Sequence, residues 1–272
     1  MIVLRDLTDI ASCREVVRVQ EAVWGRDGEI VPASVLLVSA KRGGILIGAL
    51  DGPRLVGFVW SMPGVRDGAP THWSHMLGVL PDVRGRGVGR DLKLAQRDRA
   101  LAAGVDLIEW TFDPLQAANA HLNIAMLGGT SSTYLVDAYG QMVGPLHLGT
   151  PTDRLVVEWW IRRPHVERRI ARAQDAPPVV RSAEVASAPA ALESAAGGPS
   201  APRLELDARR VLVSIPAGFT EMQRSDASGA LVWRLAVRDA FRAYFSRGYR
   251  VVDFWISDAG GAYLLEVTPA AS

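Results

Sequence analysis

The chain has 272 residues, of which 49% are hydrophobic and 22% are charged, a balance typical of globular proteins. Its 30 Lys and Arg residues nearly equal its 29 Asp and Glu residues, and the net charge of +1 gives no indication of nucleic acid or a membrane surface as a partner. The single cysteine, Cys13, excludes an intrachain disulfide. Without a signal-peptide pattern or an apolar run of roughly 18 residues, we expect a cytoplasmic protein.

Strand and helix patterns alternate along the N-terminal part. Alternating or continuous apolar residues predict strands at Ile2–Leu7, Gly44–Leu50, Arg54–Ser61, Trp73–Val79, Asp106–Phe112, Thr130–Ala138 and Leu155–Arg162. Helical spacing predicts helices at 8–23, 32–41, 88–103 and 115–127. Gly and Pro residues predict a loop over Pro63–Thr71. This order indicates the α/β class (α+β type), with a mixed sheet that carries helices on both faces.

A sharp change in composition divides the chain. Residues 171–202 are rich in Ala, Pro, Ser and Gly and contain no aromatic residue, which predicts a linker between a domain at 1–170 and a C-terminal part at 203–272. The C-terminal part has a strand–helix–strand–strand pattern, with strands at 211–215, 249–256 and 262–267. Within its helix, Arg234, Arg238 and Arg242 recur every four residues. A solvated basic face is the favoured interpretation, and a ligand-facing stripe is the alternative.

The segment Val79–Arg90 joins a predicted strand to a predicted helix through a glycine-rich turn. Gly85, Gly87 and Gly89 occupy every second position and leave the backbone N–H groups uncovered. A helix N-terminus already presents unpaired donors and a partial positive charge, so the turn is suited to phosphate oxygens. The spacing fits neither a Walker loop nor the Gly-x-Gly-x-x-Gly dinucleotide fingerprint. The alternative is a tight turn whose glycines have only a structural role.

The longer pattern is more specific than the glycines alone. A strand that ends in Val79-Leu80-Pro81, followed by a turn and helix start over Arg84–Gly89, resembles the acyl-CoA-binding motif of the GNAT acetyltransferase superfamily. The resemblance extends across residues 1–163 in the order of strands and helices. The segments Glu21–Gly25 and Arg154–Trp160 are similar to a subgroup of large predicted acetyltransferases with a C-terminal extension.

The resemblance implies a mostly antiparallel central sheet and a coenzyme site at its centre. The backbone at Arg84, Gly85, Arg86, Gly87, Val88 and Gly89 would bind the pyrophosphate of acetyl-CoA or another acyl-CoA, with Arg90 at the rim. Leu77 and Val79, on a strand that splays from its neighbour, would pair with the pantetheine amides. The Leu77–Gly78 backbone would stabilise the oxyanion. Asn119 and Asn123 would contact the coenzyme, and no metal is implied.

The proton-transfer groups follow less directly. Family members often carry a Glu four residues before the Val of the Val-x-Pro, and here that position is His75, which we interpret as the base. Strand alternation predicts that His75 shares a face with Leu77 and Val79. A structural or substrate-contact role is its alternative, and Glu109 and Glu158 are weaker candidates.

The tyrosine acid of the family is missing. Its position falls on Ile124 or Met126, neither of which can donate a proton. Tyr134 and Tyr139 lie just beyond and are candidate substitutes, although burial in a strand is the favoured interpretation for both. Alternatively, the thiolate leaves unassisted or takes a proton from water.

Two functions from different classes are consistent with these residues. The first is an N-acetyltransferase in which an amine attacks the thioester directly, with a small-molecule amine as the acceptor rather than a protein. The second is a non-catalytic acyl-CoA-binding or sensing module. We expect the C-terminal part to cover a sheet edge, complete the acceptor pocket or form a homodimer, with the first of these roles favoured.

Overall fold

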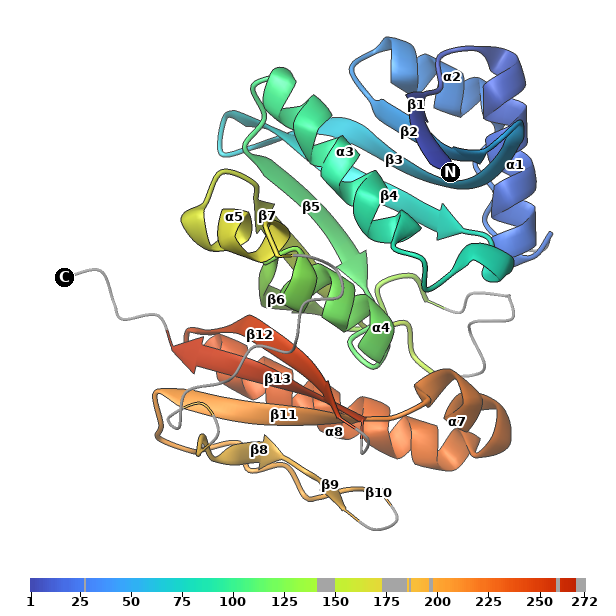
Figure 1. The fold of residues 1–272 in the computed structure, drawn as a ribbon. Helices are drawn as coiled ribbons and strands as arrows, with labels where there is room; N and C mark the ends of the chain where they lie inside the picture. Colours follow the sequence, from blue (N-terminus) through green and yellow to red (C-terminus); the bar gives the residue numbers. More distant parts are fainter. Residues whose placement is uncertain are drawn as a thin grey trace. The chain divides into compact units, whose positions relative to one another are not determined.

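The computed structural model describes residues 1–26, 28–140, 150–172, 185, 187–195, 198–257 and 260–267. These residues form two compact units (Figure 1). The first unit comprises Met1–Trp110 and Trp159–Glu167, and the second comprises the other described residues. The sequence predicted one domain over 1–170, whereas this division places residues 111–140 and 150–158 with the C-terminal strands.

The first unit is built on a mixed, mostly antiparallel sheet. The strands β1 (Ile2–Asp6), β2 (Ile45–Asp51), β3 (Arg54–Arg66) and β4 (Ala69–Val79) pair in chain order as antiparallel neighbours. The next strand, β5 (Leu107–Phe112), pairs with β4 in parallel. This arrangement confirms the predicted fold class, and the predicted strands agree with it except at the β3–β4 connection.

The connection between β3 and β4 is a tight hairpin rather than the predicted loop over Pro63–Thr71. The two strands remain in register as far as Arg66↔Ala69. Asp67 and Gly68 make the turn with φ values of 52° and 78°, as a two-residue hairpin turn of the Asp-Gly type requires. The glycine and proline content of this stretch predicted a loop, but the Asp-Gly pair was the more informative signal.

Helices cover both faces of this sheet (Figure 1). α3 (Val88–Ala102) packs on β2, β3 and β4, while α1 (Ile10–Trp24) packs on β3 and β4 and α2 (Ala33–Lys41) packs on β2. Ser74 of β4 contacts α3 through Gln96, whereas Trp60 of β3 donates a hydrogen bond to Ser39 of α2. Ser74 lies opposite Ser61, the neighbour of Trp60, and neighbouring strand residues face opposite sides. The two sets of helices therefore lie on opposite faces.

The second unit contains most of the remaining described elements. Its strands are β6 (Thr130–Leu135), most of β7 (Arg154–Trp160), β8 (Ala190–Leu192), β9 (Ser194–Ala195), β10 (Gly198–Pro199), β11 (Arg210–Pro216), β12 (Tyr249–Ser257) and β13 (Gly260–Val267). Its helical elements are α4 (Ala117–Ala120), the π-helix His121–Met126, α7 (Phe219–Ser225) and α8 (Ala227–Ser246). β12 pairs with β6 at Val251↔Ser131, so the C-terminal strands cover that edge of β6. β8 falls in the stretch predicted as a linker and pairs with β11.

Two of the three arginines in the basic stripe on α8 do not form the solvated face that the sequence favoured. Arg234 is only 1% exposed and makes a bidentate ion pair with Asp113, with both N–O distances at 2.7 Å. Arg238 makes a second bidentate pair with Asp153, with both distances at 2.8 Å. The carboxylates lie 121 and 85 residues away along the chain, so the sequence of the helix itself gives no indication of these ion pairs.

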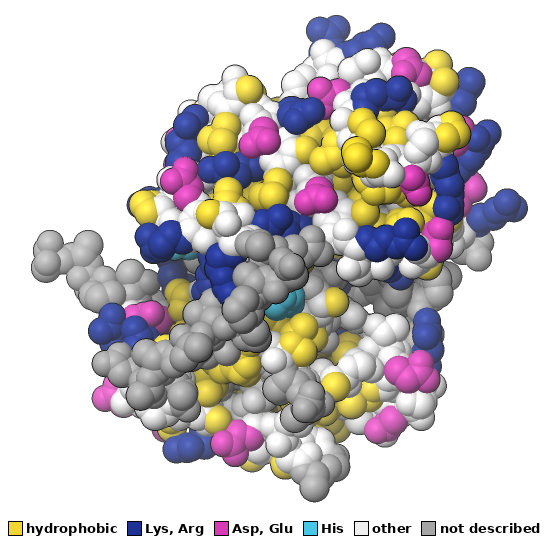
Figure 2. Space-filling view, in the orientation of Figure 1, with side chains coloured by type: hydrophobic (Ala, Val, Ile, Leu, Met, Phe, Trp, Pro, Cys, Tyr) yellow, Lys and Arg dark blue, Asp and Glu magenta, His cyan; other side chains and the backbone are white. Residues whose placement is uncertain are grey.

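The described surface carries charges of both signs. On the face shown in Figure 2, Lys and Arg side chains are interspersed with Asp and Glu side chains, as the net charge of +1 leads one to expect. Within the described residues, no helix has the length and apolar character needed to cross a membrane.

Candidate active site

The glycine-rich turn lies between the end of β4 and the start of α3. A short 3₁₀ turn, η1 (Pro81–Val83), leads from the strand into it. Gly85 and Gly87 have φ values of 78° and 83°, which side chains with a Cβ rarely adopt. A Cβ added at Gly85 would have no atom within 4 Å, so the backbone rather than packing requires glycine there. The turn is also largely exposed.

The N-terminal end of α3 presents backbone donors at this turn. Asp91 donates to the carbonyl of Gly87 at 3.0 Å, and this is the first hydrogen bond of the helical series. The N–H groups of Val88 and Gly89 precede it and therefore have no acceptor inside the helix. Together with the partial positive charge of the helix end, these donors form an anion-binding geometry.

Two arginines hold the turn in place. The Nε of Arg84 donates to the backbone carbonyl of Val79 at 3.1 Å. Arg54 of β3 makes a bidentate pair with Asp82 at 2.7 and 3.2 Å. That hydrogen bond from Arg54 also lowers the pKa of Asp82. Both contacts fix the backbone that leads into the glycines, while Arg86 remains exposed beside them.

One edge of β4 is open beside the turn. β4 pairs with β5 only over Thr71–Trp73, opposite Leu107–Glu109. Among the described residues, β4 has no sheet partner on this side from Ser74 to Val79. The splay implied by the resemblance is thus confirmed. Peptide groups around Leu77 and Val79 are available to a ligand that extends the sheet.

His75 lies in a β-bulge on β4. Trp60 pairs with Met76 and Ser61 pairs with Ser74, so His75 is the extra residue. Its ring lies edge-on to that of Trp60, with 5.2 Å between the centroids. Leu77 instead pairs with Val59, and Val59 and Trp60 face opposite sides. The prediction that His75 shares a face with Leu77 and Val79 is therefore wrong, because the bulge interrupts the alternation.

The bulge places His75 on the face that α1 and α2 cover. His75 is exposed, yet neighbouring atoms bury part of the ring and lower the pKa of the imidazole, and Glu29 raises it by a smaller amount. A lowered pKa keeps the ring neutral and able to accept a proton near neutral pH. His72, three residues earlier, is 3% exposed and hydrogen-bonds to Ser61 at 2.9 Å, so its role is structural.

α3 contains a buried lysine that was not predicted from the sequence. Lys93 is 2% exposed, and its Nζ lies 3.5 Å from the ring centroid of Trp110. The amine donates to Gln96 at 2.8 Å and to Ser74 at 3.1 Å. Burial lowers its pKa well below the usual value. Lys93 lies four residues after Gly89 and seven residues before Ala100. This helical spacing from two small residues was the signal in the sequence that Lys93 is buried.

Several other predicted residues have different surroundings. Glu109 makes an ion pair with Arg66 at 2.8 Å, so its carboxylate is already engaged and is poorly suited to act as a base. In the second unit, Asn119 lies on α4, Asn123 lies on the π-helix, and Glu158 lies on β7. Ile124, where a tyrosine acid was sought, is fully buried.

The two tyrosines weighed as substitute acids both lie in the second unit. The hydroxyl of Tyr134 donates to Asp153 at 2.8 Å. Burial, followed by the charge of Asp153, raises the pKa of Tyr134 well above its usual value, so this phenol is a poor proton donor to a thiolate. Tyr139 is exposed rather than buried, which corrects the favoured interpretation, and it shares a hydrogen bond with Thr111 at 2.9 Å.

Solved structures of acetyltransferases resemble the chain at low identity. A putative GNAT-family acetyltransferase from Desulfovibrio desulfuricans is 16% identical, with 58% of this chain and 98% of that chain covered and a TM-score of 0.45. The ribosomal-protein-S18-alanine N-acetyltransferase from Escherichia coli is 14% identical, with 58% and 92% covered and a TM-score of 0.46. A putative acetyltransferase from Salmonella typhimurium, solved with acetyl-CoA, is 18% identical, with 58% and 92% covered and a TM-score of 0.44.

A comparison with family models matches part of the chain. No curated protein matches this sequence. The family model described as the acetyltransferase (GNAT) family matches residues 10–122, a segment that contains the open edge of β4, the glycine turn and α3. Residues 10–122 are therefore similar to the acetyltransferase (GNAT) family.

Proposed function

We propose that the chain is an acyl-CoA-dependent N-acetyltransferase that moves the acetyl group of acetyl-CoA to the amine of a small-molecule acceptor. The observation that carries the proposal is the open edge of β4 directly before the exposed glycine turn. A linear coenzyme with two amides and a pyrophosphate suits this arrangement, because the open strand edge pairs with amides and the helix N-terminus that follows it binds the pyrophosphate.

In this proposal the protein backbone binds the coenzyme. The N–H groups of the turn and of the first residues of α3 hold the pyrophosphate, with Arg86 and Arg90 as cationic neighbours. The peptide groups of Leu77 and Val79 pair with the pantetheine amides. The backbone N–H at Leu77–Gly78 stabilises the oxyanion of the tetrahedral intermediate, where a single donor is worth roughly 3–4 kcal/mol.

His75 is the proposed base. An alkyl ammonium with a pKa near 10.4 has only about one neutral molecule in a few thousand at pH 7, so removal of its proton precedes attack on the thioester. The amine nitrogen then bonds to the thioester carbon, the carbon–sulfur bond breaks, the thiolate leaves, and the nitrogen releases its second proton to water to give the amide. Because the proton of Tyr134 is held by Asp153, we propose that the thiolate takes its proton from water.

Binding is tested with a matched pair of glycine variants. Gly85 and Gly68 have the same φ of 78°, and a Cβ at either position has no atom within 4 Å. Gly85→Glu and Gly68→Glu therefore introduce the same strain and the same charge, but only Gly85 lies in the proposed pyrophosphate site. Calorimetry should show CoA binding that Gly85→Glu weakens by at least tenfold and Gly68→Glu leaves intact. Equal affinities of the two variants would refute the site.

Catalysis is tested by release of the free thiol of CoA from acetyl-CoA with a panel of small primary amines. Turnover that falls in His75→Gln supports the proposal. The buried Ile124, in the position where family members carry a tyrosine, favours the second candidate, a non-catalytic acyl-CoA-binding module. Tight CoA binding without thiol release from any amine would establish this second candidate instead.

A further inference from the structure

The third arginine of the α8 stripe differs from the other two. Arg234 and Arg238 are each neutralised by one carboxylate. Arg242 follows one turn later, is exposed, and has no hydrogen bond or ion pair to any residue that the structure describes. The stripe thus consists of two arginines with matched carboxylates and one arginine whose charge is unmatched.

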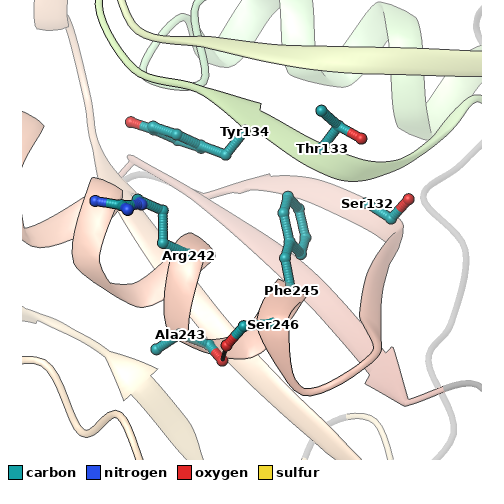
Figure 3. A pocket seen from close by; sticks show the side chains of 7 residues that line it. All are labelled: Ser132, Thr133, Tyr134, Arg242, Ala243, Phe245 and Ser246. Carbon is teal, nitrogen blue, oxygen red and sulfur yellow. Dashed lines mark hydrogen bonds between the residues drawn. The ribbon is translucent and has the colours of Figure 1, made fainter.

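Arg242 lines an open pocket between β6 and α8. The pocket has a volume of about 580 Å³, within the range of roughly 300–1,000 Å³ typical of small-molecule sites. Its lining residues all belong to the second unit and are Ser132, Thr133, Tyr134, Arg242, Ala243, Phe245 and Ser246. In Figure 3 the Arg242 side chain extends below the ring of Tyr134, and the ring of Phe245 points from the helix toward β6.

The pocket carries positive charge. Among the described residues, no carboxylate lines it, and the guanidinium of Arg242 is the only charged group there at neutral pH. Tyr134 stays neutral there, because its hydroxyl donates to Asp153 and burial raises its pKa. A planar guanidinium binds carboxylate or phosphate oxygens in a bidentate manner.

The remaining walls supply polar and apolar contacts. The hydroxyls of Ser132 and Thr133 form no side-chain hydrogen bond with the described residues, so both can donate to an anion. Ser246 already donates to the carbonyl of Ala243 at 2.9 Å and offers only an acceptor. Tyr134 is fixed by Asp153 and by stacking on Phe241, with 5.8 Å between the centroids, which makes this wall rigid.

We propose that this pocket binds a small organic anion. Its carboxylate or phosphate group pairs with Arg242 and accepts from Ser132 or Thr133. Its apolar part lies against Phe245 and the ring of Tyr134. The site consists of residues of the second unit and shares none with the glycine turn, so the inference does not depend on acyl transfer.

The test is a titration of the full chain with phenyl phosphate, benzoate, inorganic phosphate and the neutral benzyl alcohol, followed by calorimetry. Phenyl phosphate or benzoate should bind more tightly than inorganic phosphate and benzyl alcohol. The comparison of the first two identifies the preferred anionic group. Failure of both aryl anions to bind at millimolar concentration would overturn the proposal.

Variants separate this site from general attraction to a basic surface. Arg242→Gln should weaken binding of the better aryl anion about tenfold or more, the usual effect of losing a charged hydrogen bond. Arg168→Gln removes an exposed arginine on α5 (Pro164–Ile170) outside the pocket and should leave binding unchanged. Equal effects of the two variants would refute the assignment.

A third variant blocks the pocket from within. Thr133 is exposed on β6, so Thr133→Glu places a carboxylate at the pocket without burying it. This carboxylate should compete with the ligand for Arg242 and abolish binding. Gly85→Glu, which targets the proposed coenzyme site, should bind the aryl anion like the wild type. If Gly85→Glu abolished binding, the anion would be occupying the coenzyme site and the proposal would fail.

Discussion

The buried Lys93 makes a stability prediction that can be worked out from its surroundings. In Lys93→Met the side chain keeps its approximate length, and the amine, with its hydrogen bonds to Gln96 and Ser74, is lost. Those two residues stay paired, since they also hydrogen-bond to each other at 3.1 and 3.2 Å. No polar atom is left newly unsatisfied, which is the main cost of deleting a buried hydrogen bond.

The pH dependence of this substitution has a definite sign. Burial lowers the pKa of Lys93 well below 10.5 in the folded state, whereas the unfolded chain retains a normal amine. Between the two pKa values the unfolded state binds one more proton, so the stability of the wild type rises by about 1.4 kcal/mol per pH unit. Below the folded-state pKa the penalty is constant, and above 10.5 it is absent. Lys93→Met removes this dependence.

Urea denaturation at pH 8 and pH 9 measures the effect. The free energy of unfolding of Lys93→Met relative to wild type should fall by about 1.4 kcal/mol from the lower to the higher pH. Lys41→Met is the matched control, since Lys41 is exposed at the end of α2, and its substitution should show no such change. A pH-independent difference for Lys93→Met would refute the reasoning, because it would mean that the folded protein keeps this amine charged.

Three further predictions follow from the described contacts. His75→Gln should lower kcat/KM by about 100-fold or more, and the wild-type rate should rise with pH through an apparent pKa below 6.5, because burial lowers the pKa of the ring; loss of this limb in the variant is the check. Asp113→Asn should destabilise the protein by about 3–5 kcal/mol in urea denaturation, because Arg234 is left as an unpaired buried charge. Combining Asp113→Asn with Arg234→Met should recover part of that loss, and no recovery would contradict the explanation. Gly68→Ala should cost about 1 kcal/mol through its φ of 78° alone, with no change in CoA affinity.

The sequence predicted the scaffold of the first unit because its signals are local. Apolar periodicity placed the strands and helices, and Pro81 and the glycines at 85 and 87 marked the turn. The positive φ values of Gly85 and Gly87 are the physical reason why these residue types occur there. Such local signals can be recognised in a single sequence because each depends only on residues that are neighbours in the chain.

The bulge at His75 shows where such reasoning ends. Whether an extra residue is accommodated in a strand depends on the partner strand, here through Trp60 and Ser61. Nothing in the sequence around His75 distinguishes a bulge from regular alternation. One unpaired residue moves the imidazole to the other face of the sheet, so a prediction of its role required a register that only the structure supplies.

The arginine stripe on α8 shows the same limit of sequence-based prediction for ion pairs. A four-residue spacing fixes that the three arginines share one face of the helix, but it carries no information on what that face meets. Asp113 and Asp153 are the missing half of the pattern, and both come from segments far from the helix in sequence. Because a buried guanidinium without a carboxylate would be strongly destabilising, these two pairs constrain the packing of α8 within the second unit. Arg242 has no such partner among the residues that the structure describes, so its charge remains available for a ligand in the pocket it lines.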